Sequence, residues 1–527
     1  MTRVLGIEGT AWAASAAVYE ESTAELFIET DAYQPESGGI HPREAAEHMR
    51  TAIPAVVETA LEAAQGPIDA VAFSRGPGLG PCLRIVGTAA RTLAGRLDVP
   101  LVGVNHMIAH LEIGRQRSGF DSPICLNASG ANAHVLGFRN DRYRVLGETM
   151  DTGVGNAIDK FTRHVGWTHP GGPKVERAAQ DGEYVDLPYV VKGMDFSFSG
   201  IMSAAKDAFD DGVPVEDVSY ALQENIFAML TEVAERALSL TGRDELVLGG
   251  GVGQNKRLRE MLEEMTSQRD AELYAPQPEL LRDNAGMIAA LGATMLEAGD
   301  TLPIAESPIN PDFRPDQVPV TWRSGSVETS APATAEFAGA EAVVEFDGDR
   351  VRKIRQPKTY RHPTLDERLR RERTIQEVRL THEARSLGVP TPLIRDVDLA
   401  ETTIDFERVG DTDLRDALDP DRVATVGAYL AKIHGAGFVH GDPTVRNVRI
   451  RTDSDGPETV LIDFGLGYTT DDVEDYAMDL HVFEQSLAGT ADNPVTLSAA
   501  AEERYTETGD EAVLERLREI EGRGRYQ

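Results

Sequence analysis

The chain has 527 residues, more than one hydrophobic core usually supports, so we expect at least two domains. A hydrophobic content of 41% argues against a disordered chain, the lack of a long apolar stretch argues against a membrane span, and two cysteines exclude a disulfide framework, so a cytoplasmic protein is expected. The net charge of −35 is spread along the chain and not gathered in an acidic tail, which favours adaptation to strong salt; because such salt screens the charge, nucleic-acid binding is not excluded.

The first part of the chain, residues 1–322, alternates expected strands and helices as in an α/β domain. It enters a strand pattern at once, without a signal-peptide pattern. The expected strands are Arg3–Ile7, Ala70–Phe73, Leu101–Val104, Pro123–Ala128 and Glu245–Leu248. The expected helices are Ala45–Ala64, Ile85–Leu97, Tyr220–Leu240 and Ala285–Ala298.

A small, polar segment without periodicity, residues 323–335, has the composition of a linker. The expected strands Ala342–Phe346 and Arg350–Ile354 then flank Asp347-Gly348-Asp349 as in a β-hairpin. We therefore predict a first domain of residues 1–322, a linker of residues 323–335 and a second domain of residues 336–527.

Three glycine-rich turns follow expected strands in the first domain: Gly6–Thr10, Asn127–Ala133 and Leu248–Asn255. Glycine lets a backbone approach a phosphate closely, and a following helix offers unsatisfied N–H groups. Each turn alone is compatible with an ordinary tight turn, and none matches a Walker loop or a Rossmann fingerprint. Three such turns in one domain favour a nucleotide-binding cleft.

Two imidazoles four residues apart, His106 and His110, lie on one face if their segment is helical. This spacing suits two ligands of one transition metal ion. A metallopeptidase would need a glutamate directly after the first histidine, where Met107 stands, so peptidase activity is disfavoured. Asp283, at the start of an expected helix, is the candidate third ligand. The alternatives are a pair of structural histidines and an aspartate that only caps its helix.

These residues occur in one order with further motifs along residues 1–322. The set comprises His106-x-x-x-His110, Ser129-Gly130, Asp159-Lys160, His169–Pro173, Phe196–Gly200, Gly249–Val252 with Asn255, and Asp283–Ala285. As a set, these motifs resemble the universal tRNA threonylcarbamoyladenosine synthase family, the catalytic subunit of the KEOPS complex. The resemblance implies an actin-like, sugar-kinase-like α/β fold of two lobes that clasp a nucleotide.

The resemblance also implies functional residues. His106, His110 and Asp283 would hold a divalent transition metal ion, with iron favoured by the family and zinc as the alternative. The pocket for threonylcarbamoyl-adenylate would be lined by Asn127, Ala128, Ser129, Gly130, Ala131, Asp159, Gly172, Glu176 and Asn255. The family often has a tyrosine that approaches the metal at the position of Asn127, and a glycine at the position of Ala131. Asparagine in place of the tyrosine argues against a metal-ligand role for Asn127. Alanine in place of the glycine narrows the turn beside the ligand, so the shape of the pocket is expected to differ slightly.

The implied reaction moves the threonylcarbamoyl group from threonylcarbamoyl-adenylate, supplied by a separate synthase, to an adenosine amine. The acceptor is the adenosine at position 37 of tRNAs that read codons beginning with adenine. A metal ion would polarise the carbonyl group, and the backbone amides of the glycine-rich turns would stabilise phosphate and developing charge. No residue is assigned as a base, and Asp159 is expected to orient a ribose hydroxyl.

The second domain carries a kinase catalytic loop and a metal-binding tripeptide in their usual order. Asp442 and Asn447 have the loop's spacing, in which the aspartate, the candidate catalytic residue, meets the hydroxyl acceptor and the asparagine binds metal. Asp463, in Asp463-Phe464-Gly465, would supply the second metal carboxylate. The expected cofactor of this domain is therefore ATP with magnesium.

Upstream, Lys353 lies on an expected strand and would bind the ATP phosphates. Glu377, in the expected helix Arg371–Leu387, would be the ion-pair partner of this lysine. The sequence shows no G-x-G-x-x-G loop before Lys353 and no Ala-Pro-Glu segment after Asp463. The sequence therefore offers little of the surface on which a typical protein kinase binds a protein substrate.

The pattern Lys-x-Arg-x-x-Lys-x-Tyr-Arg-x-Pro-x-Leu-Asp from Lys353 to Asp366 resembles the small atypical serine/threonine kinase of the KEOPS complex. Because the two proteins are fused in some archaea, the resemblance implies a bifunctional enzyme from a halophilic archaeon. Its α+β kinase-like domain would act mainly as an ATPase or regulator, with tRNA and other KEOPS subunits as partners. The basic run Arg350–Arg373 would either contact phosphate backbone or pair with local glutamates.

Two rival functions remain open on the sequence alone. One is a small-molecule or carbohydrate kinase built on the actin-like lobes, which leaves the set of His106, His110 and Asp283 unexplained. The other is a signalling protein kinase with a metal-stapled nucleotide-binding scaffold, in which Asp442 would carry the main activity.

Overall fold

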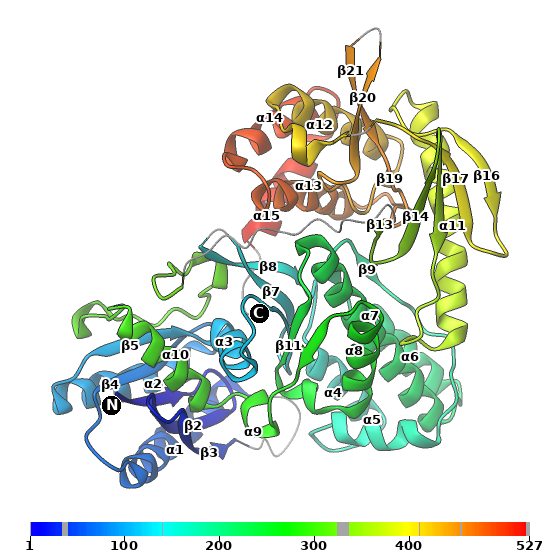
Figure 1. The fold of residues 1–527 in the computed structure, drawn as a ribbon. Coiled ribbons are helices and arrows are strands. Elements are labelled where there is room, and N and C mark those ends of the chain that lie inside the picture. The colour runs from blue at the N-terminus through cyan, green and yellow to red at the C-terminus, as the bar shows by residue number, and fades with distance from the viewer. Residues whose placement is uncertain are drawn as a thin grey trace. The chain divides into compact units, whose positions relative to one another are not determined.

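The computed structural model describes residues 2–33, 41–139, 141–323, 337–410, 412–453 and 456–522. The chain divides into two compact units, each visible in Figure 1. One is formed by residues 1–191 and 195–330, and the other by residues 331–525 with residues 192–194. Apart from Arg323, the segment 323–335 that we predict to be a linker lies outside the described residues.

The elements of the first unit correspond to the strands and helices expected from the sequence, with further elements between them. Its strands are β1 (Arg3–Glu8), β2 (Ala13–Glu20), β3 (Glu25–Ala32), β4 (Ala70–Gly76), β5 (Leu101–Asn105), β6 (Ile124–Ala128), β7 (Ala133–Arg139), β8 (Arg142–Glu148), β9 (Val191–Lys192), β10 (Asp195–Phe196), β11 (Glu245–Gly249) and β12 (Glu272–Tyr274). Its α-helices are α1 (Pro42–Ala63), α2 (Gly80–Leu97), α3 (His106–Ser118), α4 (Val154–His164), α5 (Gly172–Ala178), α6 (Ser199–Asp210), α7 (Val215–Thr241), α8 (Lys256–Gln268), α9 (Pro278–Leu281) and α10 (Ala285–Glu297).

Two five-stranded sheets of the first unit have the same strand order. In the sheet β3-β2-β1-β4-β5, strand β2 is antiparallel to both β3 and β1, and β4 and β5 run parallel to β1. In the sheet β8-β7-β6-β11-β12 the pattern recurs, with β11 and β12 parallel to β6. This repeated topology is that of a two-lobed actin-like α/β fold, so the predicted fold class is confirmed.

Helices α3 and α10 pack against each other between the two sheets. Helix α10 contacts β1 and β4 of the first sheet, whereas α3 contacts β6 and β11 of the second. Strand β1 shows why both of its faces are covered. Val4 joins the core around α3 and α10, while Leu5 and Ile7 point to the opposite face, against α1 and α2. Because successive strand residues face opposite sides, an uninterrupted apolar run is what a sheet buried on both faces requires.

Asparagine caps begin the two helices that carry the predicted metal ligands. The side chain of Asn105 accepts hydrogen bonds from the N–H groups of Met107 and Ile108, at 3.0 and 3.1 Å, so α3 begins directly at the end of β5. The side chain of Asn284 accepts one from Met287 N–H at 3.1 Å and caps α10. Asp283 precedes that cap, and the alternative in which Asp283 itself caps the helix is therefore wrong.

The second unit consists of an antiparallel sheet with one long helix, followed by a mainly helical half. Its strands are β13 (Phe337–Ala338), β14 (Ala342–Asp347), β15 (Arg350–Arg355), β16 (Ile394–Asp398), β17 (Thr403–Glu407), β18 (Thr412–Asp413), β19 (Phe438–Val439), β20 (Val448–Asp453), β21 (Gly456–Leu461) and β22 (Tyr468–Thr469). Its α-helices are α11 (Pro363–Ser386), α12 (Pro420–Gly435), α13 (Val473–Ala488), α14 (Pro494–Thr506) and α15 (Glu511–Gly522).

The five-stranded sheet has the order β13-β14-β15-β17-β16, and each pair of neighbouring strands in it is antiparallel. Helix α11 begins at Pro363, earlier than the predicted start at Arg371. The reason is local: proline is favoured at the first helical position, and the His362 side chain accepts the Thr364 N–H at 3.3 Å. A sheet with one long helix, followed by a helical half, is the α+β arrangement expected of a kinase-like domain.

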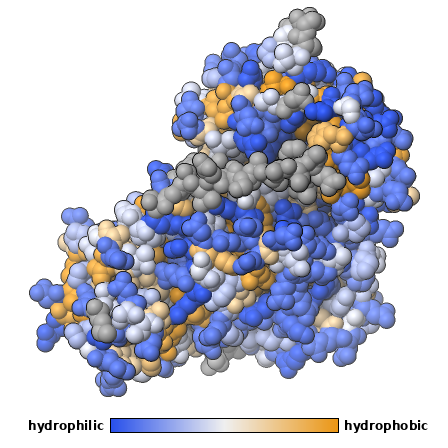
Figure 2. Space-filling view, viewed as in Figure 1, coloured by the Kyte–Doolittle hydropathy of each residue, from blue (hydrophilic) through white to orange (hydrophobic). Residues whose placement is uncertain are grey.

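The surface is largely hydrophilic, as the excess of acidic residues indicates. In the view of Figure 2, blue residues cover most of the visible surface of each unit, and the orange patches are small. Among the described residues, no helix is both long enough and apolar enough to span a membrane.

Candidate metal centre and nucleotide sites

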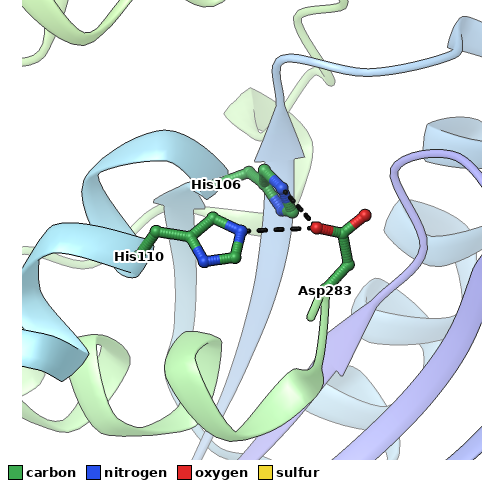
Figure 3. A group of neighbouring side chains, drawn as sticks. All are labelled: His106, His110 and Asp283. Carbon is green, nitrogen blue, oxygen red and sulfur yellow. Dashed lines mark hydrogen bonds and ion pairs between the residues drawn. The ribbon is translucent and has the colours of Figure 1, made fainter. Parts of the chain in front are cut away.

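His106, His110 and Asp283 meet in one cluster, as Figure 3 shows. The Asp283 Oδ1 atom lies 3.3 Å from the Nε2 atom of each histidine, and one ligand atom from each residue lies within 4.8 Å of the other two. Both histidines are buried, at 4% and 1% exposure. Two imidazole nitrogens and a carboxylate oxygen are a donor set that fits a divalent transition metal ion.

Two further residues, Glu8 and Trp12, form hydrogen bonds to side chains of this triad. The Glu8 Oε2 atom lies 3.1 Å from the His106 Nδ1 atom, and Glu8 is fully buried. The Trp12 Nε1–H group donates to Asp283 Oδ2 at 3.0 Å. A carboxylate that accepts Nδ1–H leaves the Nε2 lone pair of His106 facing the triad, which is the arrangement that a metal-binding imidazole requires.

The protonation of each residue in the triad depends on the charges of its neighbours. Burial acts to lower the pKa of His106, but the Glu8 and Asp283 carboxylates outweigh burial and raise that pKa to about 10. Burial lowers the pKa of His110. Burial alone would raise the pKa of Asp283, yet the two imidazoles hold it below its ordinary value. A divalent ion bound here would take the place of the proton on His106.

Asn127 and His134 lie on the second sheet beside His110. They are directly opposite each other on β6 and β7, so both side chains project from the same face. A methyl group on Gly249 would lie 3.5 Å from both the Asn127 Oδ1 atom and the His110 Cβ atom, which places Asn127 next to α3. Burial, together with the nearby His110 and Arg314, lowers the pKa of His134 to about 3, so His134 is neutral.

The glycine-rich turn after Asn127 rests on the start of α4. Within the turn, Ser129 N–H donates to the Asn132 carbonyl at 2.8 Å. The Ser129 and Gly130 carbonyls accept the N–H groups of Gly155 and Asn156, at 3.2 and 2.9 Å. Ala131 is exposed at the tip, while Ala128 is buried at the end of β6.

The other predicted pocket residues connect α4, α5 and α8. Asp159 accepts the Gly171 N–H at 2.7 Å, directly before Gly172, and its second oxygen lies 3.0 Å from His169 Nδ1. Glu176 on α5 accepts the Lys256 N–H at 2.8 Å. The side chain of Asn255 caps α8 and donates to Gln223 at 3.1 Å. Asp159, Glu176 and Asn255 thus each form hydrogen bonds that link neighbouring helices and loops of the first unit.

In the second unit, Lys353 on β15 binds two carboxylates. Its Nζ atom lies 2.8 and 3.0 Å from the Glu377 oxygens and 2.7 Å from Asp463 Oδ1. Burial acts to raise the pKa of Asp463, but the Lys353 ammonium outweighs burial and holds that pKa below its ordinary value. The lysine, its helical partner on α11 and the metal carboxylate therefore lie together, as the kinase pattern predicts.

The predicted catalytic loop is held by hydrogen bonds between its own residues and by Asp479 of α13. The Asn447 Nδ2 atom donates to both the Asp442 carbonyl and the Asp442 Oδ2 atom at 2.8 Å. Asp479, on α13, accepts the backbone N–H groups of His440 and Gly441 at 2.7 and 2.8 Å. Asp479 also lies 3.1 Å from His434 Nε2 and is buried.

The basic run Arg350–Arg373 is paired with acidic residues of the same unit. The pairs are Arg350 and Arg352 with Asp405, Arg355 with Glu341 and Glu377, Arg361 and Arg370 with Asp366, and Arg373 with Glu341. This favours the alternative of local ion pairs over contact with a phosphate backbone.

Sequence reasoning missed three residues that hold these sites in place: Glu8, Trp12 and Asp479. Glu8 has a readable signal, since a carboxylate inside a glycine-rich turn after a buried strand is costly to bury without a partner. Trp12 and Asp479 have no such signal, because each reaches residues far away in the sequence.

The fold and the site thus define a protein with an actin-like two-lobed unit that carries a His-His-Asp cluster, and a second unit with the α+β arrangement of a kinase-like domain. The sequence pattern of the tRNA N6-adenosine threonylcarbamoyltransferase family matches residues 21–290. The chain belongs to the family of bifunctional tRNA threonylcarbamoyladenosine biosynthesis proteins, as whole-length relatives show.

Three of these relatives, all archaeal, carry the name "Probable bifunctional tRNA threonylcarbamoyladenosine biosynthesis protein". The one from Haloarcula marismortui is 69% identical over 100% of both chains. The one from Halobacterium salinarum is 70% identical over 100% of this chain and 99% of its own. The one from Methanospirillum hungatei is 52% identical over 99% of both. Among solved structures, full-length HypF in its phosphate- and nucleotide-bound form is 13% identical, with a TM-score of 0.42 over 57% of this chain and 56% of that chain.

Proposed function

We propose that the first unit transfers the threonylcarbamoyl group of threonylcarbamoyl-adenylate to the exocyclic amine of adenosine 37 in tRNA. The amine nitrogen forms a bond to the carbamoyl carbonyl carbon, the bond from that carbon to the phosphate oxygen breaks, AMP leaves, and the amine loses a proton. The cluster of His106, His110 and Asp283, with Glu8 behind it, is the observation that carries this proposal.

The protein's own residues divide the work. His106, His110 and Asp283 hold a divalent ion, iron or zinc, which when bound polarises the carbonyl group. The glycine-rich turn Ser129–Ala131 lets the backbone approach the adenylate phosphate closely. The N–H groups of Ser129, Gly155 and Asn156 are bonded to carbonyl groups and hold the shape of the turn. Asp159 positions the loop before Gly172 and is placed to orient a ribose hydroxyl.

For the second unit we propose ATP turnover that regulates the transfer reaction, by an atypical serine/threonine kinase or ATPase. Lys353 binds the phosphates, Asn447 and Asp463 bind magnesium, and Asp442 orients the attacking hydroxyl or water. The three-way contact of Lys353 with Glu377 and Asp463 supports this assignment. The protein would act in the cytoplasm with tRNA, other KEOPS subunits and a separate synthase that supplies the adenylate.

A high-salt transfer assay tests both assignments. Labelled threonine, bicarbonate, ATP, the adenylate-forming enzyme, tRNA and the remaining complex subunits are combined with wild type, His106→Ala, Asp442→Ala or the control His48→Ala. We expect label in tRNA with wild type and with His48→Ala, and none with His106→Ala. Full transfer by a folded His106→Ala protein would refute the metal-centre mechanism. With Asp442→Ala we expect loss of ATP hydrolysis and reduced multiple-turnover transfer.

A further inference from the structure

Four buried polar atoms beside the metal centre have no hydrogen-bond partner among the described residues. They are the Nδ1 atom of His110, both the Nδ2 and Oδ1 atoms of Asn127, and the Nε2 atom of His134. Proteins rarely leave such atoms unpaired, and neighbouring exceptions call for a common explanation. Asn127 is only 1% exposed, so bulk water does not supply the missing partners.

The four atoms form two complementary donor–acceptor pairs. His110 faces Asp283 with Nε2, so a metal-binding His110 carries its hydrogen on Nδ1 and must donate it. Asn127 offers one acceptor, Oδ1, and one donor, the Nδ2 amide. His134 makes a hydrogen bond to the Ala133 backbone, which leaves its Nε2 atom as an acceptor in the neutral ring. These groups would allow a hydrogen bond from His110 Nδ1–H to Asn127 Oδ1, and one from Asn127 Nδ2–H to His134 Nε2.

The backbone places these groups for such a chain. Asn127 and His134 are register partners on β6 and β7, and side chains at such positions have Cβ atoms about 4.5–5.5 Å apart. Gly249 separates Asn127 from α3, and its missing side chain leaves the space between Asn127 Oδ1 and the His110 Cβ atom open. A direct bond after a small rotamer change, or one bridging water, completes each link.

We propose that Asn127 and His134 are positioning residues that fix the tautomer and ring orientation of His110 at the metal centre. They do for His110 what Glu8 does for His106, but with a neutral amide and imidazole in place of a carboxylate. This role differs from direct ligation of the metal by Asn127. It also rests on the proposed metal centre.

Metal affinity measured by competition with a chelator tests this role in the full-length protein. The set is wild type, Asn127→Leu, His134→Leu, the double variant, His134→Gln and the control His48→Leu. We expect a loss of about 10- to 100-fold for Asn127→Leu, in the range found when outer-shell partners are removed. The double variant should lose no more than Asn127→Leu, because the chain from His134 reaches the metal only through Asn127. His134→Gln, whose side-chain oxygen accepts the same hydrogen bond, should retain the wild-type affinity.

Other results would overturn the role. Losses that multiply in the double variant mean that the two residues act independently. A ligand lost from the X-ray absorption spectrum of the iron-loaded Asn127→Leu protein means that Asn127 binds the ion itself. If Asn127→Leu fails to fold, the pair His134→Leu and His134→Gln decides, because His134 is only partly buried. A wild type that binds no divalent ion overturns the metal centre as well, whereas binding that is unchanged in every variant overturns this inference alone.

An independent observation concerns Trp167, one of three tryptophans in the chain. Trp12 donates to Asp283 and Trp322 stacks on Tyr143, but Trp167 lines a surface hollow of about 560 Å³. The hollow's other lining residues include Thr168, Lys174 and Arg177. Residues 160–178 contain four Lys or Arg and one acid, in a chain whose net charge is −35.

The hollow lies on the side of α5 away from the predicted adenylate pocket. Lys174, Arg177 and Ala178 are spaced along one helical face, and Glu176, which accepts the Lys256 N–H, lies on the opposite face. An aromatic ring beside cations, in an otherwise acidic chain, fits the base and phosphate of an unpaired nucleotide. We infer that this hollow binds a loop nucleotide of the tRNA substrate, which rests on the proposed transfer function.

Binding of unmodified tRNA to the full-length protein tests this hollow over KCl concentrations at which the protein stays folded. We expect Trp167→Ala to weaken binding about 5- to 100-fold, Trp167→Phe to retain most of the affinity, and the control Arg50→Ala to change nothing. The double variant Lys174→Ala/Arg177→Ala should lower the salt dependence by about one to two units of slope. Unchanged affinity in Trp167→Ala, beside a wild type that binds, overturns this inference alone. A wild type that does not bind tRNA counts against the proposed function.

Discussion

Replacing Glu8 with glutamine should weaken metal binding, although the substitution only exchanges one carboxylate oxygen for an NH₂ group. Glu8 Oε1 accepts the Thr10 N–H at 2.8 Å, and Oε2 accepts from His106 Nδ1 at 3.1 Å. In Glu8→Gln an amide NH₂ must face one of these two donors, because only one oxygen remains. If it faces His106, the imidazole moves its proton to Nε2, the atom 3.3 Å from Asp283.

The expected magnitude follows from this switch of tautomer. Loss of an outer-shell partner costs about 10- to 100-fold in metal affinity, or about 1.4–2.8 kcal/mol. The fully buried position of Glu8 argues for the upper part of that range. A chelator competition at constant pH measures the change, with the exposed carboxylate variant Glu44→Gln as control. Affinity within twofold of wild type in a folded Glu8→Gln protein would refute the assignment of Glu8 as the partner of His106.

Three further predictions concern the turn, a buried acid and the second unit. Gly250→Ala should lower stability by about 1–3 kcal/mol in denaturant unfolding, because Gly250 has φ of 84° and the new methyl would lie 2.2 Å from the Ala128 carbonyl oxygen. Burial and the nearby Glu148 raise the pKa of Asp195 to about 7, so the folded state holds a proton that the unfolded state releases, and stability falls as pH rises from about 4 through 7. Asp195→Asn should remove this loss, on the order of 2–4 kcal/mol at pH 8, and equal pH profiles of Tm for variant and wild type would contradict it. Lys353→Met should reduce ATP hydrolysis at least ~100-fold while the unit stays folded, because Glu377 keeps its ion pair with Arg355; a folded variant with wild-type turnover would show that Lys353 does not bind the phosphates.

The parts of these sites that could be predicted from sequence are those that local spacing determines. His106 and His110 are one helical turn apart, and Asp442 and Asn447 share a short loop, so their proximity follows from the chain itself. The central strands could be predicted from uninterrupted apolar runs, because β1, β4, β6 and β11 are buried on both faces, and the helices from apolar residues spaced three and four apart. Asp283 was a candidate third ligand from its place at the start of an expected helix, and its place in the ordered set of motifs supported this prediction.

Contacts between residues that are far apart in the sequence could not be predicted from the spacing of residues along the chain. Glu8 ends β1 and His106 follows β5, and the pairing of these strands in the order β1, β4 and β5 brings the two residues together. His134 gave no signal because a single histidine on a strand is usually structural. For the arginines of β15 and α11, the sequence left contact with a phosphate backbone and pairing with local glutamates both open, since partners such as Asp405 and Glu341 lie on other strands or loops.

The repeated topology of the first unit has a mechanical consequence. The chain passes from the first sheet to the second through α3, between β5 and β6, and it returns to the first sheet through α10 after β12. His106 and His110 belong to the outgoing crossing, and Asp283 belongs to the returning one. An ion bound to both crossings would tie the outgoing and the returning segment together. Metal binding would therefore limit how far the two sheets can move relative to each other.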